Sequence, residues 1–458
     1  MASTAAADLP EGPLLAYYGD DFTGSTDAME AMTAAGVPTV LFLETPTTAM
    51  LARFPDARCI GIAGSSRGRS PEWMDAELPK VFAALAALRA PILHYKVCST
   101  FDSSPTIGSI GRAIDLGVKH MPGRWSPTIV GAPRLKRYQV FGHLFAAVDG
   151  VGHRLDRHPT MSRHPVTPMG ESDLRRHLAA QTSRRIELVD MLSLRQGAAN
   201  ERIAAIQGED VPVVFLDVLD EETLAAAGRV VWEQRGNGVF SASSSGLQYA
   251  LAAHWRALGW LRSTPSLPKA AAVPAIAVVS GSCSPGTAAQ IAWARENGFR
   301  TERLRLQAAL SDDATRDGEI ERVVGLAVEA IGAGVSPLVF SAEGPDDAAV
   351  TGFDALARDA GRSRSEAARR IGTTLAEVMR RLLDRTALTR IVVAGGDSSG
   401  EVASALGIQA LTVSAGLAPG APLCRVWSGT AKRDGLEIVL KGGQIGGPNF
   451  FGLSRDGE

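Results

Sequence analysis

Two adjacent aspartates, Asp20 and Asp21, follow the short apolar run at residues 14–18 and a single glycine. Two carboxylates side by side repel each other, and neither has a basic neighbour in the sequence. A small polar turn and a helix-compatible pattern come next, which places the pair at the end of a strand. There the carboxylates could bind a hydroxylated ligand or accept a proton from it. Capping of the following helix by Asp21 is the simpler alternative.

Other apolar runs in the N-terminal half are also followed by polar residues. Arg67 lies in the segment 64–70, and Lys96 precedes a series of hydroxyl residues that extends to about residue 111. Arg67 and Lys96 could hold a carboxylate or an oxo group, although a surface arginine and turn-forming serines explain each residue singly. Together, at successive strand ends, they favour a small sugar-like anion. The candidate substrate-binding residues are Asp20, Asp21, Arg67, Lys96, Val97, Cys98 and Ser99, and the candidate catalytic residues are Asp21 and Asp20.

Three glycine- and serine-rich segments follow apolar runs in the C-terminal half, at residues 278–294, 392–407 and 441–452. Glycines let a ligand approach the backbone, and hydroxyls with free N–H groups at a helix start can hold phosphate oxygens. None of the segments is a P-loop or a GxGxxG element. A serine-capped turn explains any one of them, but three in one domain favour a nucleotide. The candidate ATP-binding residues are Ser280, Ser282, Ser284, Gly395, Gly396, Asp397, Ser398, Ser399, Gly442 and Gly443.

Strands that end at a common edge are needed to bring such residues together. Apolar runs alternate with alanine-rich helical runs along the chain, a rhythm typical of βαβ units. We therefore predict an α/β fold with two α/β domains, mostly parallel sheets and a cleft between them. The stretch 259–274, with three prolines, predicts a linker. The expected division is a disordered tail at 1–12, an acid-sugar-binding domain at 13–260 and a nucleotide-binding domain at 272–458.

Two local features complete this picture. The last two apolar runs, at residues 424–427 and 436–440, lie close together in the sequence and predict a hairpin. The segment 150–170 is polar and rich in histidine, with little periodicity, and it predicts a long loop. Whether that loop is functional or a plain surface excursion is left open.

Composition excludes several classes of function. The chain has 458 residues and a formal charge of −2, from 47 basic and 49 acidic residues, which favours neither a nucleic-acid nor a membrane partner. No apolar run is long enough to span a bilayer. Four scattered cysteines predict neither disulfides nor a zinc site, and no metal-ligating residues are identified. The N-terminus lacks the features of a secretory signal, so a cytoplasmic protein is expected.

These motifs, in this order, resemble the four-carbon acid sugar kinase family, formerly described as a domain of unknown function. The resemblance covers nearly the whole chain. The family's DDxTG element is similar to residues 20–24, and its serine-arginine turn to Ser66 and Arg67. Its GSCS element is similar to residues 281–284, its GGD-type element to 395–400 and its LK-glycine element to 440–443. The resemblance implies an ATP-dependent kinase that uses Mg²⁺ and phosphorylates a terminal hydroxyl of an acid sugar.

One departure from the family pattern concerns the substrate. Threonate and erythronate kinases usually carry the stretch K-x-D-S-T-L-R-G-N, which corresponds here to residues 96–104. Cys98 stands in place of the aspartate and Asp102 in place of the arginine. The chain resembles instead the 3-oxo-isoapionate kinase-like subgroup, which acts on branched or oxidised acid sugars.

Several alternatives stay open at this point. D-threonate, D-erythronate or an oxo-tetronate could be the substrate. A non-catalytic sugar-acid sensor is the rival from another class, and it would need no ATP site. The sequence does not say which aspartate accepts the proton, and a homodimer is left open.

Overall fold

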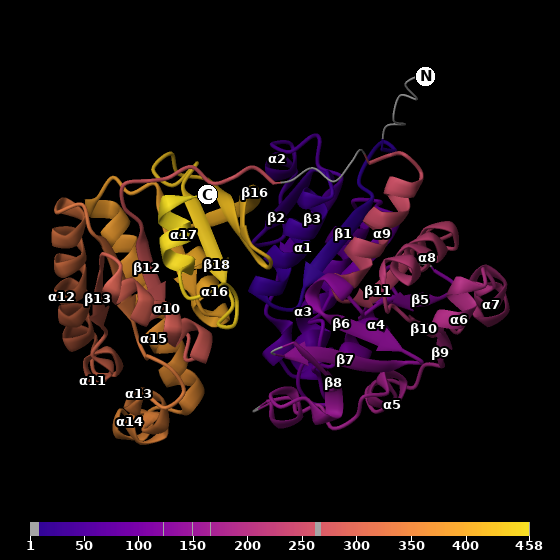
Figure 1. Cartoon of the computed structure of the whole chain (residues 1–458), viewed down its shortest axis with the longest axis horizontal. Coiled ribbons are helices and arrows are strands. Elements are labelled where there is room, and N and C mark those ends of the chain that lie inside the picture. The colour runs from indigo at the N-terminus through magenta and orange to yellow at the C-terminus, as the bar shows by residue number, and fades with distance from the viewer. Residues whose placement is uncertain (1–8, 122, 149, 165, 262–266, 458) are drawn as a thin grey trace. The chain divides into compact units, whose positions relative to one another are not determined.

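The computed structural model describes residues 9–121, 123–148, 150–164, 166–261 and 267–457. The chain divides into two compact units, Met1–Pro265 and Ser266–Glu458, each of which has its own secondary structure (Figure 1). The mixed α/β class and the mostly parallel sheets predicted from the sequence are confirmed. Most of the predicted tail, residues 1–8, and part of the predicted linker, residues 262–266, lie outside the described residues. Within the described part, no helix is both long and apolar enough to cross a membrane.

The main sheet of the first unit is parallel, with the strand order β11-β4-β1-β3-β2. These strands are buried along their whole length, because helices cover both faces of a parallel sheet. Their bounds are β1 (Leu15–Gly19), β2 (Thr39–Phe42), β3 (Cys59–Ala63), β4 (Ile92–Lys96) and β11 (Val239–Ser243).

Amphipathic helices complete the layers of this unit. In α3 (Pro71–Ala86) the buried residues Met74, Leu78, Phe82 and Leu85 recur at helical spacing and face the core. The remaining helices are α1 (Phe22–Ala34), α2 (Thr48–Leu51), α4 (Ile110–Gly117), α5 (Leu174–Ala179), α6 (Met191–Arg195), α7 (Ala199–Ile206), α8 (Glu221–Glu233) and α9 (Gly246–Ala257).

Two smaller sheets belong to the same unit. One is parallel, in the order β5-β10-β9, and the other is an antiparallel meander of β6, β7 and β8. The strands are β5 (Ser126–Thr128), β6 (Arg137–Val140), β7 (His143–Val148), β8 (Val151–Arg154), β9 (Ile186–Val189) and β10 (Val213–Leu216), and the 3-10 turns are η1 (Ser66–Gly68), η2 (Pro133–Leu135), η3 (Leu155–Arg157) and η4 (Met161–Arg163).

The expectation of a long loop at residues 150–170 is partly wrong. This segment contains β8, η3 and η4, and β8 pairs with β7 in a hairpin. The reason is that strand pairing needs only backbone hydrogen bonds. A polar strand such as β8 can therefore form without the apolar periodicity on which the sequence interpretation depended.

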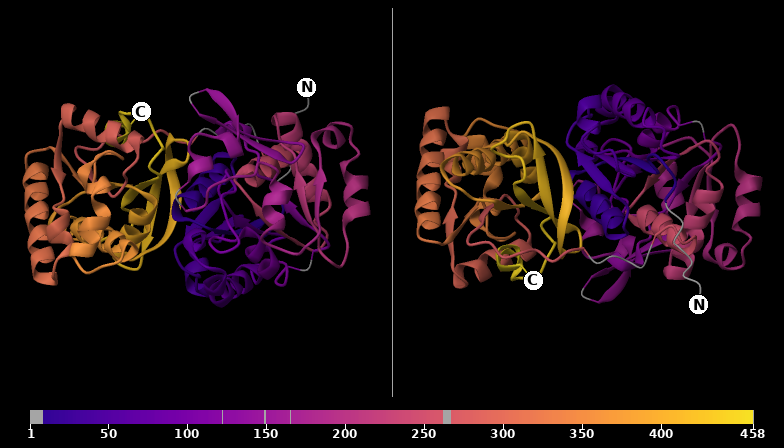
Figure 2. Two further views of the ribbon diagram at one scale, coloured as in Figure 1. Left: turned by 90° about the horizontal axis from the view of Figure 1, so that it is seen from below. Right: turned by 90° about the horizontal axis from the view of Figure 1, so that it is seen from above.

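The sheet of the second unit has the order β16-β17-β18-β15-β12-β14-β13. Its strands from β18 to β13 are parallel, whereas β16, β17 and β18 form antiparallel pairs at one edge, as Figures 1 and 2 show. The predicted C-terminal hairpin is therefore present as β17 and β18. The strands are β12 (Ala277–Ser280), β13 (Phe299–Arg303), β14 (Ser336–Phe340), β15 (Arg390–Ala394), β16 (Ile408–Ala418), β17 (Ala421–Ser428) and β18 (Glu437–Lys441).

Helices flank this second sheet as well. The long helix α15 (Arg364–Arg385) begins with a reciprocal capping box between Ser363 and Glu366 and buries one apolar face. The other helices are α10 (Pro285–Glu296), α11 (Leu306–Leu310), α12 (Asp313–Gly332), α13 (Ala348–Thr351), α14 (Phe353–Asp359), α16 (Gly396–Ala405) and α17 (Phe450–Asp456).

Candidate active site

In the first unit, neighbouring parallel strands bring the predicted substrate residues to one edge of the sheet. Asp20 follows β1 directly, Lys96 is the last residue of β4, and Arg67 lies in η1 after β3. The backbone N–H of Arg67 donates to Asp20 O at 3.0 Å, and that of Asp20 donates to Lys96 O at 2.9 Å. The three segments are thus tied together by their main chains where parallel sheets usually bind ligands.

Arg67 joins the two aspartates. Its Nε and Nη2 atoms donate to the two oxygens of Asp20 at 3.1 and 2.7 Å, and Nη2 also lies 2.7 Å from Asp21 Oδ1. This bidentate contact relieves the repulsion between the carboxylates. The cation that the local sequence lacks comes from a residue about 46 positions away.

The two carboxyl groups differ in environment. The Asp20 side chain is 5% exposed, and its burial raises its pKa to about 6 even though Arg67 favours the charged form. The Asp21 side chain is 21% exposed. Its burial would raise the pKa, but Arg67 and Lys96 outweigh that effect and hold the pKa of Asp21 below its usual range. Of the two, Asp20 is the better proton acceptor near neutral pH and Asp21 is the more accessible.

Asp21 also has a structural role. It is the N-cap of α1, where its side chain accepts hydrogen bonds from Gly24 N at 3.0 Å and Thr23 Oγ1 at 2.8 Å. Lys96 is buried and lies 3.3 Å from Asp27 on the same helix. Both features fix the first turn of α1 against the end of β4.

The predicted substrate residues that follow β4 differ in how far their side chains are buried. Val97 is buried and its N–H donates to Ser243 O at 2.8 Å, so its side chain belongs to the core. The Cys98 thiol lies 2.9 Å from Thr100 Oγ1, and burial raises its pKa. Ser99 is partly exposed. Among the predicted substrate residues of this segment, Cys98 and Ser99 are therefore the accessible ones.

Asp102, which replaces the arginine of the resembling motif, is nearly buried. Its oxygens lie 2.5 Å from Thr100 Oγ1 and 3.5 Å from Thr167 Oγ1. Thr167 in turn contacts His164 Nδ1 at 3.1 Å. The histidine-rich segment thus packs on the segment that follows β4, a contact that could not be predicted from local sequence patterns.

In the second unit, hydroxyl groups from α10 converge on the loop after β18. Ser284 is the N-cap of α10, and its hydroxyl donates to Gly443 O at 2.5 Å. Thr287 Oγ1 lies 3.0 Å from Ser282 Oγ and 3.2 Å from Lys441 Nζ. The structure therefore brings two of the three predicted ATP segments into direct contact. Thr287 belongs to the same cluster but was not identified from the sequence.

Close backbone approach joins the third segment to this cluster. A Cβ atom at Gly281 would lie 2.1 Å from Ser398 Oγ, and one at Gly443 would lie 2.7 Å from Ser282 Oγ. Gly395 has φ +119°, a conformation that favours glycine. Gly396, by contrast, has no atom within 4 Å of its Cβ position, so the first turn of α16 faces open space there.

Polar groups without full partners mark the same region. The Ser280 hydroxyl is buried and has no hydrogen-bond partner among the described residues. Lys441 is completely buried, its ammonium donates to Thr287 Oγ1, and burial lowers its pKa to about 8. Ser398 and Ser399 are buried, Gly442 is partly exposed, and Asp397 is exposed in the first turn of α16.

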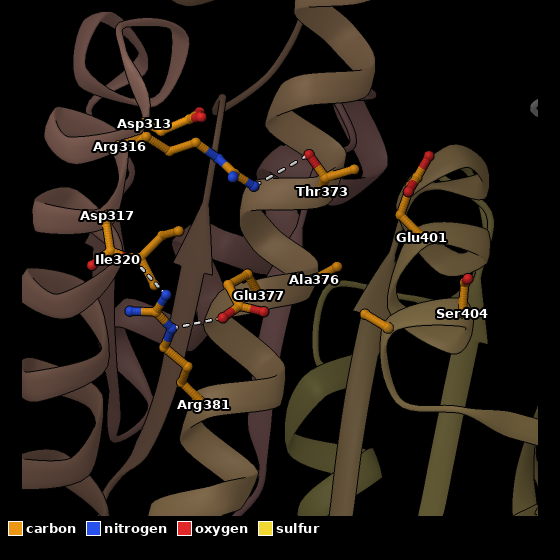
Figure 3. Close-up of a pocket in the computed structure, with 11 residues that line it drawn as sticks. Asp313, Arg316, Asp317, Ile320, Thr373, Ala376, Glu377, Arg381, Glu401 and Ser404 are labelled. Carbon is orange, nitrogen blue, oxygen red and sulfur yellow. Dashed lines mark hydrogen bonds and ion pairs between the residues drawn. The ribbon is translucent and has the colours of Figure 1, made fainter.

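A separate cavity of about 370 Å³ lies between α12, α15 and α16 (Figure 3). Arg381 of α15 forms ion pairs with Asp317 of α12 and with Glu377 of its own helix, and Arg316 donates to Thr373. None of the predicted ATP-binding residues lines this cavity. Its lining contains four acidic side chains and two arginines, a balance that disfavours phosphate groups, so the hydroxyl cluster is chemically the better candidate for the nucleotide site.

Known proteins place this arrangement in a family. The description "Sugar-binding N-terminal domain" matches residues 15–251, and "Nucleotide-binding C-terminal domain" matches residues 277–451. The chain belongs to the four-carbon acid sugar kinase family. A 3-oxo-isoapionate kinase of Paraburkholderia graminis is 71% identical over 99% of this chain and 97% of its own length. A 3-oxo-tetronate kinase of Pseudomonas savastanoi pv. phaseolicola is 31% identical over 96% of both chains. The family and the phosphotransferase class predicted from the sequence are confirmed.

Solved structures show the same fold. One described as the putative tRNA synthase from Salmonella typhimurium LT2 is 25% identical, with a TM-score of 0.77 over 95% of this chain and 97% of that chain. A Haemophilus influenzae protein is 23% identical, with a TM-score of 0.71 over 96% and 99%. The second likeness concerns the fold alone.

Proposed function

We propose that this chain is an ATP-dependent kinase that phosphorylates a terminal hydroxyl of 3-oxo-isoapionate. The observation that carries the proposal is the 71% identity, over almost the full chain, to a protein named for that activity. The site is compatible with it, because one unit presents carboxylates and cations at strand ends and the other presents hydroxyls and helix N-termini. A 3-oxo-tetronate is the second candidate substrate, since relatives at 31% identity carry that name.

In this proposal the first unit binds the acid sugar through the segments that follow β1, β3 and β4. Asp21, the more exposed carboxylate, accepts a hydrogen bond from a substrate hydroxyl and orients it. Asp20, with the raised pKa, takes up the proton as the hydroxyl oxygen bonds to the γ-phosphorus and ADP leaves. Arg67 holds both carboxylates at fixed positions, and its positive charge favours the later transfer of the proton from Asp20 to water, which restores the carboxylate.

The second unit would hold ATP by its phosphates. The open N–H groups at the start of α16 and the hydroxyls of Ser282 and Ser284 suit phosphate oxygens. The buried ammonium of Lys441 contacts Thr287 of this cluster, and its positive charge would offset the negative charge of the phosphates. The remaining proposed contacts come from Ser280, Gly395, Gly396, Asp397, Ser398, Ser399, Gly442 and Gly443.

Mg²⁺ is expected to reach this site on the nucleotide. The described residues contain no group of three or more His, Cys, Asp or Glu side chains that could hold a metal ion. Mg²⁺ is commonly bound by one or two carboxylates together with substrate phosphates and water. Asp397, exposed beside the open turn of α16, is the residue that fits, and Mg²⁺ would supply charge neutralisation there.

A kinase assay tests the proposal. Purified protein with Mg-ATP is expected to release ADP with 3-oxo-isoapionate, at a higher kcat/KM than with 3-oxo-tetronates, D-threonate or D-erythronate. A preference for a tetronate would change the proposed substrate and leave the proposed kinase activity in place. Calorimetry that detects no Mg-ATP binding would instead favour the sugar-acid sensor. A homodimer and a cytoplasmic location stay predictions.

The pH dependence of turnover follows from Asp20. Its carboxylate must be ionised to accept a proton, and its pKa is about 6. We therefore expect kcat/KM to be constant well above pH 6 and to fall about tenfold for each further pH unit below it. Rates measured from pH 5 to 8 check this. A profile that stays flat down to pH 5 would exclude Asp20 as the proton acceptor.

A further inference from the structure

The predicted substrate cations of the first unit already have acidic partners. Arg67 pairs with both Asp20 and Asp21, and Lys96 pairs with Asp27. These five side chains carry three potential negative charges against two positive ones. An acid sugar brings a further carboxylate, which this set alone would repel. A cation without an acidic partner is therefore needed near the same residues.

Arg137, the first residue of β6, is such a cation. Its Nη1 atom donates to the backbone oxygens of Leu135, Lys136 and Ala147 at 3.1, 3.2 and 3.4 Å. Its Nε atom is buried and has no hydrogen-bond partner among the described residues. No carboxylate of the described residues forms an ion pair with it, and burial lowers the pKa of its guanidinium.

The contacts of Arg137 leave a particular edge of the guanidinium unused. Backbone carbonyls occupy Nη1, whereas Nε and Nη2 donate to no group in the described part of the chain. The Nε–Nη2 edge is one that binds carboxylates with two parallel hydrogen bonds, and Arg67 uses its own Nε and Nη2 on Asp20 in this manner. The carbonyls fix the orientation of the plane and leave the Nε–Nη2 edge without a partner among the described residues.

Backbone hydrogen bonds place Arg137 near the carboxyl end of the main sheet. Ser243, the last residue of β11, accepts from Val97 N at 2.8 Å with its carbonyl and from Ile129 N at 2.8 Å with its hydroxyl. Three residues after Ile129, Ala132 exchanges backbone hydrogen bonds with Arg137 at 2.9 and 3.2 Å. Arg137 therefore pairs with the segment that packs against the end of β11, next to the residues that follow β4.

We propose that Arg137 binds the carboxylate of the acid sugar through its Nε–Nη2 edge, and so determines the preference for an acid substrate. This inference rests on the proposed function. It also explains how the site tolerates Asp102 where the resembling threonate and erythronate motif has an arginine. Here Asp102 is turned toward Thr100 and Thr167, and the β6–β7 hairpin supplies the cation instead.

The competing explanation is that Arg137 only clamps the hairpin through its three backbone contacts. The two roles predict different kinetics. A clamp would affect stability and all substrates alike, whereas a carboxylate-binding residue would affect the acid and spare a neutral analogue. The test therefore compares 3-oxo-isoapionate with its carboxamide, which keeps the hydroxyls and lacks the charge.

The variant Arg137→Gln is expected to raise KM for 3-oxo-isoapionate roughly 10- to 100-fold, the range that the loss of hydrogen bonds to a charged group produces. Its KM for the carboxamide and for ATP is expected to stay within about twofold. Arg137→Lys, which keeps the charge without the fork, should lie between the two. Arg134→Gln is the matched control, because Arg134 is an exposed arginine three residues away.

The outcomes separate this inference from the proposed function. The wild type could turn over 3-oxo-isoapionate and have the same KM for it as Arg137→Gln. That result would overturn the role of Arg137 and leave the proposed kinase activity unaffected. Binding of 3-oxo-isoapionate in calorimetry without turnover would overturn the kinase, and a weaker Kd in the variant would still support Arg137. Should Arg137→Gln fail to fold, Arg137→Lys decides. The inference requires that its KM rises more for the acid than for the carboxamide, and equal changes in the two KM values would contradict it.

Discussion

Asp21→Asn is expected to lower kcat by roughly 10²- to 10⁴-fold, the usual contribution of assisted proton transfer, because the substrate hydroxyl loses the carboxylate that orients it toward Asp20. The fold should survive, because asparagine caps helices about as well as aspartate and can keep the contact to Gly24 N. The proposed ATP site lies in the other unit, so ATP binding should be unchanged. Steady-state kinetics, calorimetry with ATP and a melting curve measure the three quantities.

The expected fall in kcat comes from the loss of the negative charge of the Asp21 carboxylate. The amide oxygen can keep the position of Oδ1, which accepts from both Gly24 N and Arg67, but the amide nitrogen cannot replace Oδ2, which accepts from Thr23. The substrate hydroxyl then loses its charged orienting acceptor, and Arg67 loses the negative charge of one of its two acidic partners. Asp20→Asn should also abolish turnover, with a lower melting temperature as well, since it breaks a bidentate pair whose carboxylate is almost fully buried.

Asp173→Asn provides the matched control. Asp173 is likewise the N-cap of a helix, α5, and likewise pairs with an arginine, Arg175, at 2.8 Å. Any loss that comes only from weaker capping or from a missing surface ion pair should appear in this variant too. Near-normal kcat in both Asp20→Asn and Asp21→Asn would remove the aspartates from the chemistry.

Local patterns were sufficient for one part of the site. A buried run of apolar residues followed by small polar ones predicts the carboxyl end of a strand, and such ends meet at one edge of a parallel sheet. That rule placed Asp20 and Lys96 correctly at the ends of β1 and β4, and Ser284 before α10. Each of these positions is determined by residues within one turn or one strand of it.

The partners of these residues could not be predicted in the same way. Arg67 reaches the aspartates from about 46 positions away, and Ile129, on the segment that leads to Arg137, contacts Ser243 at the end of β11 from 114 positions away. Burial, which separates the pKa of Asp20 from that of Asp21, depends on the packing of the whole unit. Such contacts follow from tertiary structure, and no spacing in the sequence encodes them.

Gly396→Val is expected to weaken ATP binding roughly 100-fold while the protein stays folded. A Cβ at Gly396 meets no atom within 4 Å, and the residue does not have the positive φ that strains other side chains, so the variant should keep its melting temperature within a few degrees. Gly395→Val is expected to destabilise the fold instead, because φ is +119° at residue 395, a conformation that favours glycine.

The expected loss comes from the space that the valine would fill. The open first turn of α16 exposes N–H groups that the proposal assigns to phosphate oxygens, and a branched side chain would keep those oxygens out of hydrogen-bond distance. Losing one or two hydrogen bonds to a charged phosphate corresponds to about 100-fold in Kd. Gly325→Val on exposed α12, where a Cβ also meets nothing, is the control and should bind ATP normally. Calorimetry with Mg-ATP measures both, and an unchanged Kd in Gly396→Val would mean that the nucleotide lies elsewhere in the second unit.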